Sequence, residues 1–76
     1  MGIVAIIVEE AENASAVNEI LHDYSDWVVG RMGVPYRQKN MNIISVIVDA
    51  PHDVISALSG KIGRLDGVSA KTVYSK

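Results

Sequence analysis

The residues best suited to bind a ligand are the cations of a segment that reads GRMGVPYRQKN and begins at Gly30. Arg31, Arg37 and Lys39 lie in it, and guanidinium groups make paired, charge-assisted hydrogen bonds to carboxylates and phosphates. Tyr36 adds an aromatic ring and a hydroxyl group to the same segment. The glycines and the proline predict a hairpin loop of about nine residues, and long loops often carry function. The segment could hold a small anion; alternatively, its cations bind acidic groups of a second chain, or they have no special role.

A second group of small and basic residues reads SGKIGR and contains Gly60, Lys61, Gly63 and Arg64. A G-x-x-G loop with flanking bases is typical of nucleic-acid clamps. Here the motif falls within a helical pattern of apolar residues, where glycine costs about 1 kcal/mol relative to alanine. We therefore interpret Ala57, Gly60 and Gly63 as a small-residue side that lets a helix approach another element.

Residues for metal binding and catalysis are scarce. The chain contains no cysteine and only two histidines, His22 and His52, whereas zinc and nickel sites take three or four ligands. The serines lack a G-x-S-x-G motif, and the adjacent Glu9 and Glu10 fall in an exposed turn. We expect no catalytic residue, no metal site and no cofactor, so the chain is not an enzyme; a metal sensor using either histidine is the alternative.

Size and charge narrow the class of protein further. With 76 residues the chain is one domain, residues 1–76, with a thin core that favours association. The net charge of −2 disfavours nucleic acid as a partner, although the first thirty residues carry −6 and the remainder +4. The opening sequence MGIVAIIVEE has no basic leader, so we expect a cytoplasmic protein without a membrane span.

The elements that would position these residues follow from the hydrophobic spacing. Apolar residues recur every three or four positions in two stretches, which predicts one helix capped by Asn13 and another that starts at Pro51. The expected order is strand Ile3–Val8, helix, strand Asp26–Met32, loop Gly33–Met41, strand Asn42–Asp49, helix and strand Val68–Tyr74. The stripes that face the core are Ala14, Val17, Ile20, Leu21 and Tyr24 in the first helix, and Val54, Ile55, Leu58, Ile62 and Leu65 in the second.

This order predicts an α+β protein with a ferredoxin-like βαββαβ sandwich, a four-stranded antiparallel sheet with two helices on one face. The first and third strands would lie in the centre, because they are apolar, or nearly so, at both odd and even positions. Two helices cover only one face of such a sheet. We therefore expect a second copy of the chain to cover the other face, giving a homodimer or a higher homo-oligomer.

Several strings resemble a small family described as regulators of iron-only hydrogenase systems. They are VNEIL at 17–21, GRMGVPY at 30–36, ISVIVD at 44–49, LSGKIGRL at 58–65 and GVS at 67–69. The resemblance implies an ACT-type regulatory domain, similar to the C-terminal domain of the nickel-responsive repressor. That repressor's nickel site is not carried over, because this chain has no cysteine and no matching cluster of histidines. The sequence also lacks a DNA-binding helical segment.

The resemblance and the residues together predict a non-catalytic, ligand-sensing oligomerisation module associated with an iron-only hydrogenase system. A small-molecule effector would bind near the boundary between chains. The candidate ligand-binding residues are Arg31, Tyr36, Arg37, Gly60 and Arg64. The alternative is a protein–protein interaction or assembly factor that has no small-molecule ligand.

Overall fold

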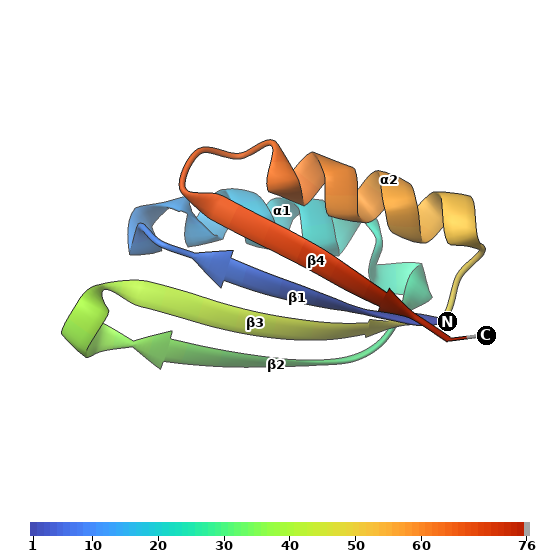
Figure 1. Ribbon diagram of the computed structural model, residues 1–76, viewed down its shortest axis with the longest axis horizontal. Helices are drawn as coiled ribbons and strands as arrows, with labels where there is room; N and C mark the ends of the chain where they lie inside the picture. Colours follow the sequence, from blue (N-terminus) through green and yellow to red (C-terminus); the bar gives the residue numbers. More distant parts are fainter. Residues whose placement is uncertain (76) are drawn as a thin grey trace.

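Four antiparallel strands form one sheet, and both helices lie on the same face of it (Figure 1). The computed structural model describes residues 1–75, so Lys76, one of the bases of the charged C-terminal part, lies outside the described residues. The strand order is β2-β3-β1-β4. The elements are β1 (Gly2–Val8), α1 (Ala14–Asp23), β2 (Val28–Tyr36), β3 (Met41–Val48), α2 (His52–Gly63) and β4 (Val68–Tyr74). This is the predicted ferredoxin-like α+β fold.

The two central strands are β1 and β3, as their apolar residues predict. They pair in antiparallel register from Gly2 opposite Val48 to Val8 opposite Asn42. Along β1, residues alternate strictly between buried and exposed, with the even positions buried under the helices. Because side chains of a strand alternate between faces, the odd positions of β1 all lie on the surface opposite the helices.

The hydrophobic core fills the space between the sheet and the two helices. A fully buried aliphatic side chain contributes about 1.5–3 kcal/mol relative to an exposed one. No polar or charged residue is buried among residues 1–75. The buried residues are Val4, Ile6, Val8, Val17, Leu21, Ile44, Val46, Val48, Ile55, Leu58, Ile62 and Val68.

Asn13 does precede α1, but its side chain does not cap the helix. Its Nδ2 atom donates instead to the carbonyl oxygen of Asp66, at 2.8 Å. The amide of Glu9 also donates to the carbonyl of Gly67, at 2.7 Å, so the start of α1 is tied to the turn before β4. Gly67 has φ of 69°, a left-handed conformation that glycine adopts without steric cost.

The prediction of a nine-residue loop at Gly33–Met41 was wrong. Residues 33–36 continue β2 as far as Tyr36, and only a short 3-10 helix, Arg37–Lys39, and Asn40 join it to β3. Asn40 has φ of 52°, which lets the chain reverse tightly. Pro35 is tolerated because β2 is an edge strand, where a missing amide hydrogen need not interrupt the sheet.

The glycines of α2 do not lie in close contact with another element of the described chain. A Cβ atom added at Gly60 or Gly63 would meet nothing within 4 Å, beyond the helix's own backbone. The expectation that these glycines let the helix pack closely against a neighbouring element is therefore wrong for residues 1–75. The helix packs through Ile55, Leu58 and Ile62 on its opposite side.

Candidate functional site

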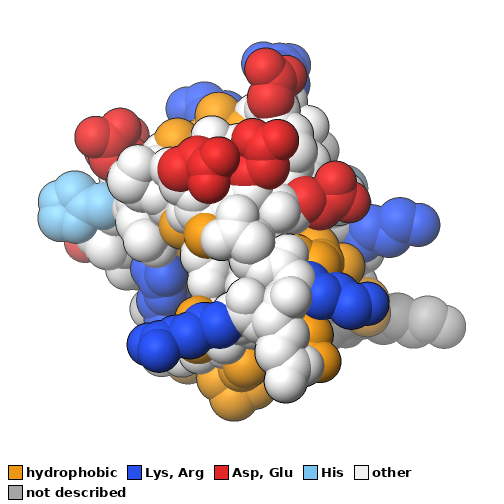
Figure 2. Space-filling model, turned by 90° about the vertical axis from the view of Figure 1, so that its left-hand side faces the viewer, with side chains coloured by type: hydrophobic (Ala, Val, Ile, Leu, Met, Phe, Trp, Pro, Cys, Tyr) orange, Lys and Arg blue, Asp and Glu red, His pale blue; other side chains and the backbone are white. Residues whose placement is uncertain are grey.

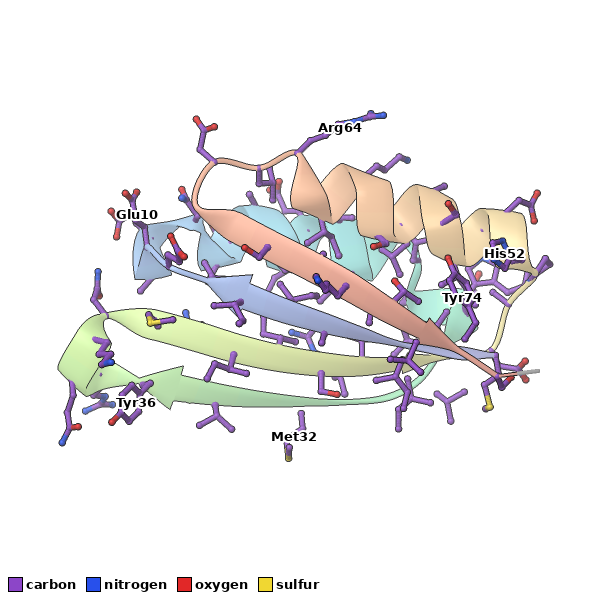
Figure 3. All side chains as sticks on the ribbon, in the orientation of Figure 1. Glu10, Met32, Tyr36, His52, Arg64 and Tyr74 are labelled. Carbon is purple, nitrogen blue, oxygen red and sulfur yellow. The ribbon has the colours of Figure 1, made fainter. Side chains whose placement is uncertain are left out.

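The sheet surface opposite the helices, which we call the open face, is mostly apolar. Its large side chains remain well exposed, from 40% for Ile7 and Ile47 to 65% for Met32 and 69% for Val73. In Figure 3, Met32 and Tyr36 point away from the helices. The residues of the open face are Ile3, Ala5 and Ile7 of β1, Gly30, Met32, Val34 and Tyr36 of β2, Met41, Ile43, Ser45 and Ile47 of β3, and Ser69, Lys71 and Val73 of β4.

Charge is distributed unevenly around this surface. Lys71 is the single charged residue among those of the open face. Viewed from the end of the molecule, acidic side chains gather on the half that carries the helices, and basic side chains flank the apolar surface below (Figure 2). An apolar surface that lacks acidic groups and has cations around it can bury area against a partner without desolvating a carboxylate.

One end of the open face is hollowed. A depression of about 230 Å³ is lined by Met1, Gly2, Ile3, Ile47, Val73 and Tyr74, together with Ser75. The ring of Tyr74 stacks on the ring of His52, the first residue of α2, with centroids 4.1 Å apart. This contact with α2 holds the Tyr74 ring in place beside the hollow. Local sequence patterns did not predict this stack, because its two residues are 22 positions apart.

The second surface of interest lies between α1 and β2 and depends on a β-bulge. Val28 pairs with Val48 but Gly30 pairs with Ile47, so Val29 is an extra residue in β2. With regular pairing Arg31 would lie opposite Ser45, on the open face. The bulge places Arg31 opposite Val46 instead, and so on the side of the helices.

Arg31 reaches α1 from this position. Its Nη2 atom donates to Oδ1 of Asn18 at 2.7 Å, which joins the edge strand to the helix. A hollow of about 310 Å³ opens on one side of this hydrogen bond, and one of about 230 Å³ opens on the other. We call the larger hollow the α1–β2 groove; it is lined by Asn18, Leu21, His22, Ser25, Val28 and Arg31.

The predicted ligand-binding residues do not form one cluster within the chain. Arg31 lies beside the α1–β2 groove, Tyr36 lies on the open face, and Arg37 starts the hairpin turn. The hydroxyl of Tyr36 donates to Oε1 of Gln38 at 2.9 Å. Gly60 lies on α2 and Arg64 directly follows it, and Figure 3 shows Arg64 on the helix layer, on the other side of the sheet from Tyr36.

The remaining charged and aromatic groups make local contacts. Nζ of Lys61 lies 5.1 Å from the centre of the Tyr24 ring, a cation–π contact that joins α2 to the end of α1. Within residues 1–75 there is no group of three or more histidine, aspartate or glutamate side chains placed to hold a metal ion. The helices of this described part are also too short or too polar to cross a membrane.

Comparison with known proteins assigns the family. Residues 1–72 match the family model described as "TM1266-like: Iron-only hydrogenase system regulator, putative". The chain belongs to this family. It is also similar to the solved structure of the uncharacterized protein TM1266 from Thermotoga maritima, with 45% identity and a TM-score of 0.92, over 99% of this chain and 95% of that one. The resemblance expected from the GRMGVPY and LSGKIGRL strings is thus confirmed.

A more distant likeness extends to the fold alone. A formyltetrahydrofolate deformylase from Pseudomonas putida KT2440 has a TM-score of 0.70 and 15% identity. The likeness covers 97% of this chain and 28% of that enzyme. No curated protein matches this member of the regulator family.

Proposed function

We propose that this member of the family is a non-catalytic regulatory module that works as a homo-oligomer, at least a dimer, and senses a small molecule. The observation that supports self-association is the apolar open face, with Met32 and Val73 at 65% and 69% exposure. A soluble monomer leaves such a surface bare at the risk of nonspecific aggregation. A second copy of the same chain is the partner that is present wherever the protein is made.

The size of the open face fits this proposal. Strands lie about 4.8 Å apart and residues advance about 3.3 Å, so four strands of about seven residues span roughly 440 Å² in plane. Projecting side chains raise the accessible area above that figure, towards the roughly 800 Å² per partner of a stable interface. Two such faces would pack as the layers of a β-sandwich do, about 10 Å apart.

The regulatory and non-catalytic parts of the proposal have separate support. The family description supplies the regulatory role in an iron-only hydrogenase system. The lack of cysteine, of a nucleophile motif and of a metal-ligand cluster within the described chain favours binding over catalysis. We place the module in the cytoplasm, where the reducing environment suits a chain without disulfides, and its net charge of −2 argues against direct nucleic-acid binding.

Sedimentation equilibrium at micromolar concentration tests self-association. We expect a mass of at least twice the 8.2 kDa of one chain. An open face that buries apolar area should also make the thermal midpoint rise with protein concentration, because dissociation accompanies unfolding. A species of 8.2 kDa at all concentrations, with a constant midpoint, would contradict the proposal.

The sensing part separates this proposal from an assembly factor that binds only proteins. A ligand at 100 times its dissociation constant stabilises the folded state by about 2.7 kcal/mol. Thermal-shift measurements with amino acids, other small carboxylates, nucleotides and divalent metals should therefore reveal at least one compound that raises the midpoint. A flat response across the panel would favour the assembly factor.

A further inference from the structure

The β-bulge in β2 has a consequence for ligand binding, because it decides which surface receives the charge of Arg31. Val29 is the extra residue, and the two side chains that follow Gly30 diverge: Arg31 faces α1, whereas Met32 lies on the open face. Bulges that re-aim a side chain occur often beside functional sites. Here the bulge keeps a guanidinium group off the apolar surface and delivers it to the α1–β2 groove.

The α1–β2 groove has no acidic side chain among the described residues of its lining, although acidic residues are frequent in this part of the chain. Six acidic residues and no bases occur among the first thirty residues. Glu19 and Asp23 line an adjoining depression along α1, which shares Asn18 and His22 with the groove. The Arg31 guanidinium is held by a neutral amide, Oδ1 of Asn18, which fixes its position without neutralising its charge.

Polar and apolar groups surround the guanidinium on its open side. His22 and Ser25 can hydrogen-bond to an anion, and the side chains of Leu21 and Val28 form apolar wall. The groove has a volume of about 310 Å³, at the lower end of the range for small-molecule sites. One fixed cation, a few hydrogen-bonding groups and an apolar wall are complementary to a monoanion with a small hydrocarbon body.

We propose that the α1–β2 groove binds a small carboxylate. The carboxylate would form a paired hydrogen bond with Arg31, and its hydrocarbon part would contact Leu21 and Val28. A monocarboxylate fits better than a multiply charged phosphate compound, because Glu19 and Asp23 lie on the neighbouring surface of α1. This inference rests on the sensing part of the proposed function and names the chemical class of the effector.

The groove also offers a route from ligand to self-association. Arg31 and Met32 are adjacent residues of the same edge strand, on opposite sides of the sheet. A carboxylate bound by Arg31 would hold β2 against α1, and would thereby restrict the strand that carries Met32, Val34 and Tyr36 on the open face.

The experiment is an amide-resolved NMR titration of the full chain with two pairs of probes. Benzoate and isovalerate are the carboxylates, and benzamide and isovaleramide are their neutral counterparts of the same shape. We expect saturable shifts for the amides of Asn18, His22, Ser25 and Arg31 with at least one carboxylate, and at least about tenfold weaker binding of the amide counterpart.

Two variants locate the site. Arg31→Gln should weaken binding of the carboxylate at least about tenfold, whereas Lys71→Gln, which removes an equal charge on the opposite face of the sheet, should leave the affinity within about twofold. Arg31 is exposed, so its replacement is compatible with folding. Absence of saturable shifts with both carboxylates, equal binding of the amides, or unchanged binding by Arg31→Gln would each overturn the inference.

Failure of this inference can be told apart from failure of the proposed function. Sedimentation of the same samples reports the oligomeric state without regard to the ligand. An oligomer that binds neither carboxylate overturns the ligand class and leaves self-association intact. A monomer that binds a carboxylate at Arg31 supports the inference and contradicts self-association.

Discussion

At the scale of single residues, Gly67 and Gly60 have opposite effects on the stability of the fold. Gly67 has φ of 69° at the turn before β4, whereas Gly60 lies inside α2 with open space around its missing side chain. Left-handed backbone costs an ordinary residue about 1–2 kcal/mol, and glycine in a helix interior costs about 1 kcal/mol relative to alanine. The same substitution should therefore have opposite signs at the two positions.

Gly67→Ala should destabilise the protein by about 1–2 kcal/mol, because alanine must adopt the strained conformation there. Urea denaturation measures the change, as a lower midpoint with an unchanged slope. The nearest atom to an added Cβ is Nδ2 of Asn13 at 3.5 Å, an ordinary contact, so the loss would come from the backbone alone. Unchanged stability would show that the turn can relax to a negative φ.

Gly60→Ala should stabilise the folded chain by about 1 kcal/mol, since nothing within 4 Å of the added Cβ opposes it. The same urea experiment measures this gain. If the variant instead loses stability or oligomer mass, Gly60 contacts a second copy of the chain. That result would indicate that the small-residue side of α2 packs closely against a second copy of the chain.

Among the elements, α2 depends most on its packing against the sheet. Its buried residues are Ile55, Leu58 and Ile62, and its glycines lower its intrinsic helix propensity. A helix of this length is marginal in isolation. We infer that the core-facing side of α2 carries most of its stability.

Leu58→Ala should cost about 2–5 kcal/mol, because Leu58 is fully buried and the cavity left behind cannot collapse completely. The whole stability of such a domain is about 5 kcal/mol, so this variant should retain at most about 3 kcal/mol. Circular dichroism with urea provides the measurement. Leu65→Ala is the control, since Leu65 is only partly buried and its loss should cost clearly less.

At the scale of the whole molecule, we expect the open face to determine whether the protein is a monomer or an oligomer. Met32 is the most exposed large residue of β2 on this face, so it can be replaced without disturbing the core. A glutamate there would have to be desolvated in any interface that covers the sheet.

Met32→Glu should shift the oligomer to monomer, with a dissociation constant raised at least about tenfold. Ser56→Glu adds the same charge at an exposed position of α2 and should leave the mass unchanged. Sedimentation equilibrium compares the two variants with the parent chain. Dissociation by Ser56→Glu but not by Met32→Glu would place the interface on the helices.

Most of the fold was predictable from local patterns. Apolar spacing placed both helices and the last strand, and the apolar residues at odd and even positions of β1 and β3 identified the central strands. The main error in the predicted elements occurred in β2. Gly33 and Pro35 are typical of loops, but pairing with Ile44 and Asn42 of β3 holds them in a strand. Such pairing joins residues that are distant in sequence, and it outweighs local preference.

The sequence by itself determined that Arg31 is a candidate for binding an anion, that four strands and two helices occur in the order βαββαβ, and that the sheet has an apolar open face. Only the tertiary structure decided the side of the sheet on which Arg31 lies, its contact with Asn18, and the separation of Gly60 and Arg64 from the other predicted ligand-binding residues. The physical reason is the period of two in a strand. One extra residue, Val29, reverses the direction of each later side chain relative to regular pairing, and only the register with β3 reveals it.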